Sequence, residues 1–217
     1  MTKIKISGIE AKIEKTDSYL QINDVSAAGL ADIMQQLKTD YATYDRWLCF
    51  RNVEPPYALL DELGAKLEDD CAQMFLYDDI VFHISDLYIK RVTENDFDEF
   101  AAFHDKCNPS MYWTGERLRR DLSRWGIFYT RNKGQIESYI IMSMGHPSIA
   151  EVMCVESKSL SVSGGLLAHA TKFAFENQKS RVLFMADYGM SRTAALSVGF
   201  VVTGFYKGYK ISKGDIL

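Results

Sequence analysis

The sequence predicts a mixed α/β protein, and three observations lead to this prediction. Apolar residues at helical spacing alternate along the chain with short runs of β-branched and aromatic residues. Of the 217 residues, 47% are hydrophobic and 25% are charged, which is typical of a globular protein and excludes disordered and collagen-like chains. The length suits one large domain or two small ones.

The first 86 residues predict a small α/β domain. Leu30, Ile33, Met34 and Leu37 follow helical spacing, and a second helical pattern follows the Pro55–Pro56 break. The predicted elements are helices over 25–37 and 58–67 and strands over 47–50, 74–77 and 80–83. No motif in this region carries recognisable chemistry.

Residues 87–217 predict a second, larger domain. A hairpin is expected around the turn Asn132–Gly134, because strand-like runs flank it on both sides. The expected strands are 88–92, 126–131, 138–144, 149–155, 182–186, 200–202 and 205–211. The expected helices follow Thr93 or Asn95, Thr114 and Gly165, and a short one spans 191–198.

The charges are distributed unevenly between the two regions. Residues 1–86 hold 8 basic and 16 acidic side chains, whereas residues 87–217 hold 17 basic and 13 acidic ones. The second region therefore suits an anionic ligand, but its small excess and lack of a long Lys/Arg run exclude a nucleic-acid-binding protein. The arginines between Arg117 and Arg124 form either a solvated helix face or an anion-binding edge.

Neither a signal peptide nor a membrane-spanning segment is predicted. The segment 1–15 has no apolar core, and the longest apolar runs are far shorter than the ~20 residues that span a bilayer. A cytoplasmic protein without a membrane partner is therefore expected. No pair of cysteines forms C-x-x-C, so free thiols and no metal site are expected for Cys49, Cys71, Cys107 and Cys154.

A segment of small residues over 157–165 separates the strand 149–155 from the following helix. Loop amides and a helix N-terminus together attract anions, and Lys158 adds a full positive charge. A phosphate site and a plain strand-to-helix connection both stay open. Neither the G-K-[ST] of a P-loop nor the dinucleotide motif G-x-G-x-x-G is present.

The order of elements over 87–217, together with two motifs, resembles the GNAT acetyltransferase superfamily. Its R/Q-x-x-G-x-G/A motif before a Leu-Leu helix falls on Lys158, Ser161 and Ser163, with serines at both glycine positions. Its later S-N-x-x-Y-x-K-x-G-F pattern falls on 191–200, with Ala195 in place of the tyrosine that often protonates the leaving thiolate.

The resemblance implies a GNAT-like acyl-CoA N-acyltransferase fold with a mixed sheet, and acetyl-CoA as co-substrate without a metal. Loop amides would hold its pyrophosphate, and strand backbone groups would hold the pantetheine arm. The residues that the resemblance assigns to acetyl-CoA are Met153, Cys154, Val155, Lys158, Ser161, Val162, Ser163, Gly164, Gly165, Ser191 and Arg192.

The reaction needs a base for the amine and a proton for the thiolate. Glu151 is the candidate base, since it resembles a catalytic glutamate position of the superfamily; an exposed or ion-paired carboxylate is the alternative. Tyr188 is the nearest phenol for the acid role, with a packing role as the alternative. By the same analogy Tyr112 and Trp113 contact the acceptor, unless they cap the core.

The predicted function is transfer of the acetyl group of acetyl-CoA to a primary amine of a small molecule or an amino acid. The alternative is a non-catalytic acyl-CoA-binding sensor or partner module, which Ala195 favours. A homodimer is left open. Three roles stay open for the domain 1–86: a degenerate half-copy of the fold, a support for a cationic amine, or a protein-interaction domain. The layout of the whole chain distantly resembles β-lysine N-acetyltransferase-type proteins.

Overall fold

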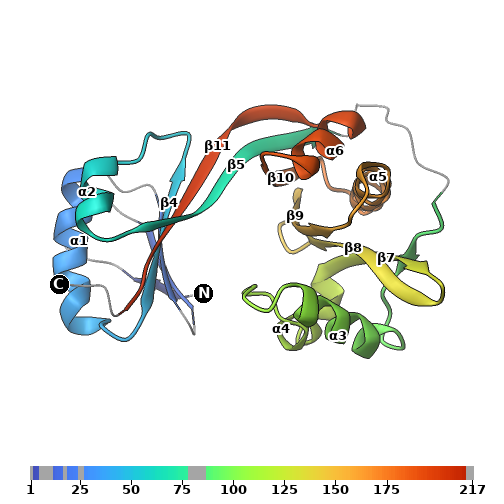
Figure 1. Ribbon diagram of the computed structural model, residues 1–217, viewed down its shortest axis with the longest axis horizontal. Coiled ribbons are helices and arrows are strands. Elements are labelled where there is room, and N and C mark those ends of the chain that lie inside the picture. The colour runs from blue at the N-terminus through green and yellow to red at the C-terminus, as the bar shows by residue number, and fades with distance from the viewer. Residues whose placement is uncertain (1, 5–11, 17–18, 24–26, 78–86, 214–217) are drawn as a thin grey trace. The chain divides into compact units, whose positions relative to one another are not determined.

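The computed structural model describes all residues except 1, 5–11, 17–18, 24–26, 78–86 and 214–217 (Figure 1). It divides into two compact units: unit 1 comprises 1–72 and 204–217, and unit 2 comprises 73–203. This division differs from the predicted boundary between residues 86 and 87. Two strands, β5 (Lys66–Tyr77) and β11 (Val201–Ile211), contribute residues to both units.

Unit 1 is a sheet with one long helix. The strand order is β1-β2-β3-β4-β11-β5, in which β3 and β4 are parallel and α1 (Ala27–Asp40) connects them. Strand β11 pairs antiparallel with β4, from Tyr206 opposite Arg51 to Ile211 opposite Arg46. A fragment that begins at residue 87 would therefore contain β11 without β4. The remaining strands are β1 (Thr2–Ile4), β2 (Lys12–Lys15), β3 (Tyr19–Asn23) and β4 (Asp45–Arg51).

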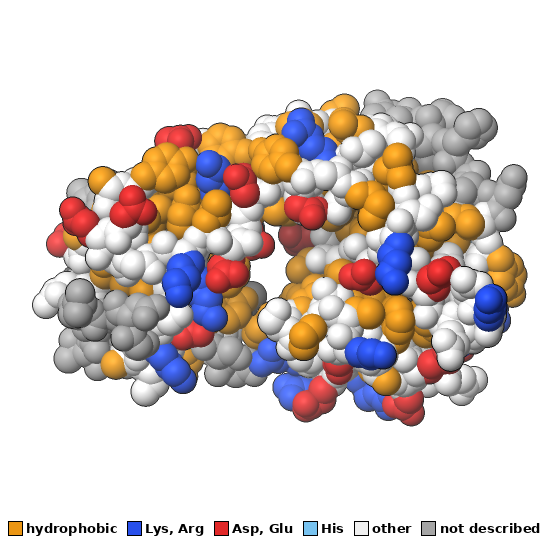
Figure 2. All heavy atoms as spheres, in the orientation of Figure 1, with side chains coloured by type: hydrophobic (Ala, Val, Ile, Leu, Met, Phe, Trp, Pro, Cys, Tyr) orange, Lys and Arg blue, Asp and Glu red, His pale blue; other side chains and the backbone are white. Residues whose placement is uncertain are grey.

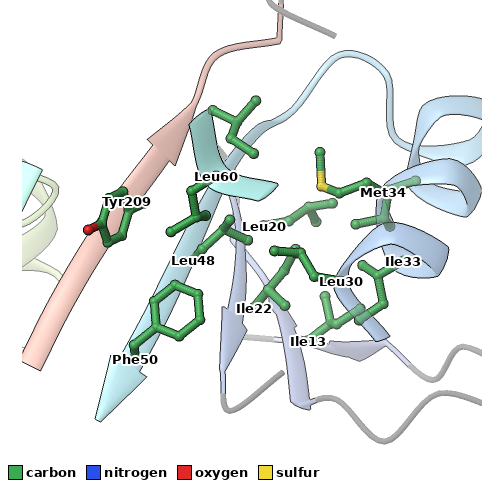
Figure 3. Packing of buried hydrophobic residues seen from close by; sticks show 12 residues of the cluster. Ile13, Leu20, Ile22, Leu30, Ile33, Met34, Leu48, Phe50, Leu60 and Tyr209 are labelled. Atoms are coloured by element: carbon green, nitrogen blue, oxygen red, sulfur yellow. The ribbon is translucent and has the colours of Figure 1, made fainter. Parts of the chain in front are cut away.

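The core of unit 1 lies between α1 and the sheet. The four residues that predicted the helix, Leu30 to Leu37, are all buried, and Figure 3 shows Leu30, Ile33 and Met34 pointing toward the strands. Leu20, Ile22, Leu48 and Phe50 meet them from the sheet. This confirms the predicted helix 25–37 and the predicted strand 47–50, whereas the sequence pattern predicted none of the strands β1, β2 and β3.

The second helix of unit 1 is shorter than predicted. Helix α2 spans Tyr57–Glu62, and Gly64 adopts a left-handed conformation with φ of +64°. Such a residue ends a helix, so the chain continues as β5 from Lys66 although Leu67 keeps the helical spacing. The predicted strand 80–83 lies outside the described residues.

Unit 2 has helices on both faces of its central strands. Figure 1 shows α3 and α4 on one face of β7 and β8 and α5 on the other. Its elements are β6 (Lys90–Arg91), α3 (Phe97–Cys107), α4 (Gly115–Arg119), a 3₁₀ turn (Leu122–Arg124), β7 (Trp125–Asn132), β8 (Gln135–Ser143), β9 (Ile149–Glu156), α5 (Leu160–Glu176), β10 (Arg181–Asp187) and α6 (Met190–Val198).

The strand order in unit 2 is β5-β10-β9-β8-β7-β6. Strands β9 and β10 are parallel and joined through α5, whereas β6, β7, β8 and β9 are antiparallel neighbours. The predicted hairpin between β7 and β8 is confirmed: Asn132 lies opposite Gln135, and Lys133 and Gly134 form the turn with φ of 50° and 84°.

The arginine cluster on and after α4 forms a solvated helix face. On the face in Figure 2, acidic and basic side chains of unit 2 are interspersed. Each of these arginines has a partner within the protein: Arg119 with Asp98, Arg120 with Glu116, Arg124 with Asp121 and Arg117 with the ring of Tyr112.

Candidate functional site

The parallel ladder between β9 and β10 ends before the strands do. The register runs from Ile149 opposite Arg181 to Val152 opposite Phe184, while β9 continues to Glu156 and β10 to Asp187. Within the described span 149–187, residues 153–156 have no register partner on β10, and all four are partly exposed. Their backbone groups on this side are thus available to an extended ligand with amide groups.

The same stretch of β9 is bulged against its other neighbour, β8. Cys154 lies opposite Ile141 and Val152 lies opposite Met142, so Met153 is the extra residue. Both Met153 and Cys154 pack against the core beneath α3 and α4, as expected when a bulge turns two consecutive side chains to one face. The bulge therefore bends β9 at the point where its ladder with β10 ends.

The sheet register places Glu151 on the face covered by α3 and α4. Glu151 pairs across with Ser143 and Glu156 pairs with Tyr139, and residues two apart on β8 point to the same side. Tyr139 and Ile141 belong to the core on that side, whereas α5 covers the opposite face. The candidate base and Cys154 thus share one face, next to the bulge.

The segment proposed as the phosphate loop is mostly helix, and this corrects the prediction. Only Ser157, Lys158 and Ser159 separate β9 from α5, which begins at Leu160. The Ser163 amide donates to the Ser159 carbonyl at 2.9 Å, as in a helix. The residues predicted as loop but found within α5 are Ser161, Val162, Ser163, Gly164 and Gly165.

The helix begins early because its buried face extends back to Ser163. Ser163, Leu166, Leu167 and Ala170 are buried at helical spacing, so the apolar stripe includes part of the Ser/Gly segment. Gly164 lies against α6, where an added Cβ would be 3.4 Å from the Ser197 hydroxyl. These residues therefore pack the helix, and the Ser163 amide is not available to an anion.

The amides that a helix N-terminus leaves unpaired here belong to Leu160, Ser161 and Val162. The Ser159 and Ser161 hydroxyls lie 2.9 Å apart beside them, and the Ser157 hydroxyl accepts from the Ser159 amide at 3.2 Å. Lys158 is exposed in the same turn. The unpaired amides of this helix N-terminus thus lie six residues nearer to β9 than predicted, because α5 begins at Leu160 and not at Leu166.

The N-termini of α5 and α6 lie at the same end of the sheet, where β9 and β10 have their carboxyl ends. This follows because β9 and β10 are parallel, β9 leads into α5 and β10 leads into α6. Ser191 and Arg192 lie in the first turn of α6. Tyr188 is 56% exposed, and the Arg192 guanidinium lies 5.2 Å from the centre of its ring. Ala195, the residue aligned with the expected tyrosine, is fully buried in α6.

The predicted acceptor contacts, Tyr112 and Trp113, are part of an edge-to-face aromatic cluster with Trp125. The ring centres of Trp113 and Trp125 lie 4.9 Å apart, and those of Tyr112 and Trp113 lie 5.0 Å apart. Trp113 packs against the core, as the alternative role predicts, and like Tyr112 it stays partly exposed. Contact of these two residues with an acceptor stays a prediction.

Three residues that sequence reasoning did not single out converge on this region: His104, Asn108 and Tyr139. His104 continues the buried face of α3 that begins with Phe97 and Phe100, and a polar residue on an apolar helix face was the available signal. Tyr139 is hidden in the alternating pattern of β8, where nothing distinguishes it from a core tyrosine.

In the part of the chain that the structure describes, no group of three or more His, Cys, Asp or Glu side chains could hold a metal ion. None of the four cysteines, all of which the structure describes, forms a disulfide: Cys49 and Cys71 are buried, Cys154 is partly buried and Cys107 is exposed. None of the helices in that part is long and apolar enough to cross a membrane.

Comparison with known proteins identifies the fold. A functionally unknown conserved protein from Staphylococcus epidermidis superposes with a TM-score of 0.69, at 12% identity over 97% of this chain and 94% of that chain. A GCN5-related N-acetyltransferase from Sphaerobacter thermophilus gives 0.68, at 13% identity over 92% of this chain and 75% of that one. A GCN5-related N-acetyltransferase from Kribbella flavida superposes with a TM-score of 0.67, at 12% identity over 97% of this chain and 89% of that chain.

This chain has the GNAT fold. The predicted fold class is confirmed, and because the superpositions cover 92% or more of the chain they extend beyond residues 87–217. No family model matches the sequence, and no curated protein matches it. The resemblance to β-lysine N-acetyltransferase-type proteins stays a prediction.

Proposed function

We propose that this protein transfers the acetyl group of acetyl-CoA to a primary amine of a small molecule or an amino acid. The observation that carries the proposal is the coincidence of three features: the end of the β9–β10 ladder after Val152, the bulge at Met153 and the α5 N-terminus beside Lys158. Together they offer backbone partners for a pantetheine arm and an anion site for a diphosphate.

The donor set fits acetyl-CoA. The backbone of Met153, Cys154 and Val155 would hydrogen-bond the amides of the pantetheine arm. The amides of Leu160, Ser161 and Val162 would hold the diphosphate, together with the Lys158 ammonium. Arg192, at the same edge of the sheet, would supply a second positive charge.

The acceptor must lose a proton before it attacks the thioester. For an amine with a pKa of about 10.4, deprotonation at pH 7 costs roughly 4.6 kcal/mol. Glu151 would accept this proton, since it lies on the α3/α4 face of β9, two residues before the bulge. The amine nitrogen then forms a bond to the acetyl carbon, and the carbon–sulfur bond breaks. The nitrogen loses a second proton to solvent, and the thiolate receives a proton from Tyr188 or water.

Replacing Lys158 with alanine should weaken CoA binding about 10-fold, because a charge-assisted contact to the diphosphate is lost. Isothermal titration calorimetry measures this. Lys172→Ala is the matched control, because Lys172 lies on α5 but pairs with Glu176, 3.8 Å away. This variant should bind CoA as tightly as the unmodified protein does. No detectable heat with CoA or acetyl-CoA in the unmodified protein would refute the proposed function.

The second candidate is a non-catalytic acyl-CoA-binding module, which the buried Ala195 favours because α6 then lacks the expected acid. Mass spectrometry of an amine library incubated with the protein and acetyl-CoA separates the two. Acetylation adds roughly 42 Da to an accepted amine, and only an enzyme forms this product. Tight CoA binding without any acetylated product would support the binding module.

A further inference from the structure

A buried polar cluster in unit 2 is not used by the chemistry described so far. His104 of α3 and Tyr139 of β8 are both fully buried, and the His104 Nδ1 lies 2.7 Å from the Tyr139 hydroxyl oxygen. The Asn108 amide nitrogen donates to the same oxygen at 2.7 Å. On the other side of the imidazole, Nε2 lies 2.7 Å from the Trp113 carbonyl oxygen.

The directions of these hydrogen bonds follow from the donor inventory of each group. A carbonyl oxygen only accepts, so the His104 Nε2 carries the hydrogen that it donates to Trp113. In a neutral imidazole Nδ1 is then an acceptor, and Tyr139 donates to it. The Tyr139 oxygen accepts from Asn108 and, more weakly at 3.9 Å, from the Cys154 thiol.

The Tyr139 hydroxyl and the Cys154 thiol, which contact each other between β8 and β9, both keep their protons. Burial raises the pKa of Cys154 to about 11. Burial also raises the pKa of Tyr139 above its ordinary value. The hydroxyl therefore stays neutral, and every hydrogen-bonding position on it is filled in one fixed arrangement.

This arrangement holds a loop at both of its ends. The segment 108–113 begins with Asn108, whose side chain binds Tyr139, and it ends with Trp113, whose carbonyl binds His104. Between them lies Tyr112, whose ring packs under the Arg117 guanidinium at 4.0 Å. One buried His–Tyr pair thus contacts both ends of the loop that carries Tyr112 and Trp113 of the aromatic cluster.

The same tyrosine also faces the bulged part of β9. Tyr139 lies opposite Glu156 in the β8–β9 ladder, and Cys154 directly follows the extra residue of the bulge. The loop 108–113 is therefore anchored through the Tyr139 hydroxyl to β8, the strand that pairs directly with the bulged part of β9.

We propose that Tyr139 is a positioning residue, which through His104 and Asn108 sets the distance between the loop 108–113 and the bulge in β9 and so determines which amines the site accepts. This inference rests on the proposed acetyl transfer. Loss of the hydroxyl should loosen the loop and weaken acceptor binding, while the α5 N-terminus and the cofactor site remain as they are.

The test compares Tyr139→Phe with Tyr129→Phe. Tyr129 is a buried tyrosine of the neighbouring strand β7 whose hydroxyl binds Asp96 at 3.2 Å, so it controls for the loss of a buried hydroxyl. For an amine found in the library screen, Tyr139→Phe should raise the KM about 10-fold with a smaller change in kcat, while the Kd for CoA is unchanged. Tyr129→Phe should leave the KM for the amine unchanged.

Hydrogen exchange gives a readout that does not depend on activity. Amides of 108–113 should exchange faster in Tyr139→Phe than in Tyr129→Phe. Should Tyr139→Phe fail to fold, Asn108→Ala removes one of the contacts at a partly exposed position and should show the same two changes. Unchanged exchange, or an unchanged KM in a protein that binds CoA, overturns the proposal. Lack of CoA binding refutes the proposed function instead, and exchange alone then decides whether Tyr139 orders the loop.

Discussion

Replacing Glu151 with glutamine should lower kcat roughly 100-fold at pH 7, because general base catalysis contributes about that much or more. The side chain lies on the face of β9 that α3 and α4 cover, opposite Ser143 and next to the bulge. Glutamine keeps the shape of the side chain and removes its ability to accept a proton. Steady-state kinetics with acetyl-CoA and an accepted amine measures the effect.

The pH profile separates a base from a merely structural carboxylate. The deficit of Glu151→Gln should shrink as the pH approaches the pKa of the amine, because free amine is then abundant without a base. Glu156→Gln is the control, since this carboxylate lies on the same strand and face but beyond the bulge. A kcat that stays within twofold of the unmodified enzyme at pH 7 would exclude Glu151 as the base.

Replacing Gly115 with alanine should destabilise the protein by about 2–3 kcal/mol. Gly115 begins α4 where this helix crosses α3, and an added Cβ would lie 2.5 Å from the Cβ of Ala101. Non-bonded carbon atoms prefer 3.5–4.0 Å. The Gly115 amide also donates to Asp105 of α3 at 2.8 Å, so α4 cannot move away without loss of that bond. Urea unfolding measures the change.

Two further variants make the Gly115 prediction specific. Gly164→Ala lies in the interior of α5, where the new Cβ has an ordinary contact of 3.4 Å, and it should be neutral or stabilise by up to about 1 kcal/mol. Adding Ala101→Gly to Gly115→Ala removes the clashing carbon and should recover much of the loss. Strictly additive effects of the two substitutions would contradict the proposed clash.

The sequence predicted the fold class and most elements of the core because those depend on local periodicity. The spacing of Leu30 to Leu37 located α1, and Lys133–Gly134 located the hairpin turn. The start of α5 was placed too late, since serines and glycines are typical of loops while burial of Ser163 draws them into the helix. The burial of Ser163, which assigns residues 160–165 to the helix, depends on three-dimensional contacts that a local sequence pattern does not show.

The long-range features had no local signal. That β11 pairs with β4 in unit 1 follows from packing between strands about 160 residues apart, which a linear pattern does not encode. The same holds for the cluster of His104, Asn108 and Tyr139, whose members come from two elements and a loop. The bulge at Met153 and the end of the ladder are likewise properties of strand pairs.

The comparison of CoA with pantetheine as ligands, made by titration calorimetry, tests the diphosphate site most directly. Pantetheine keeps the thiol arm that would lie along 153–155 but lacks the diphosphate that the amides of 160–162 and Lys158 would hold. We predict that CoA binds at least about 30-fold more tightly. Equal affinities for the two, or no binding of CoA, would contradict this account.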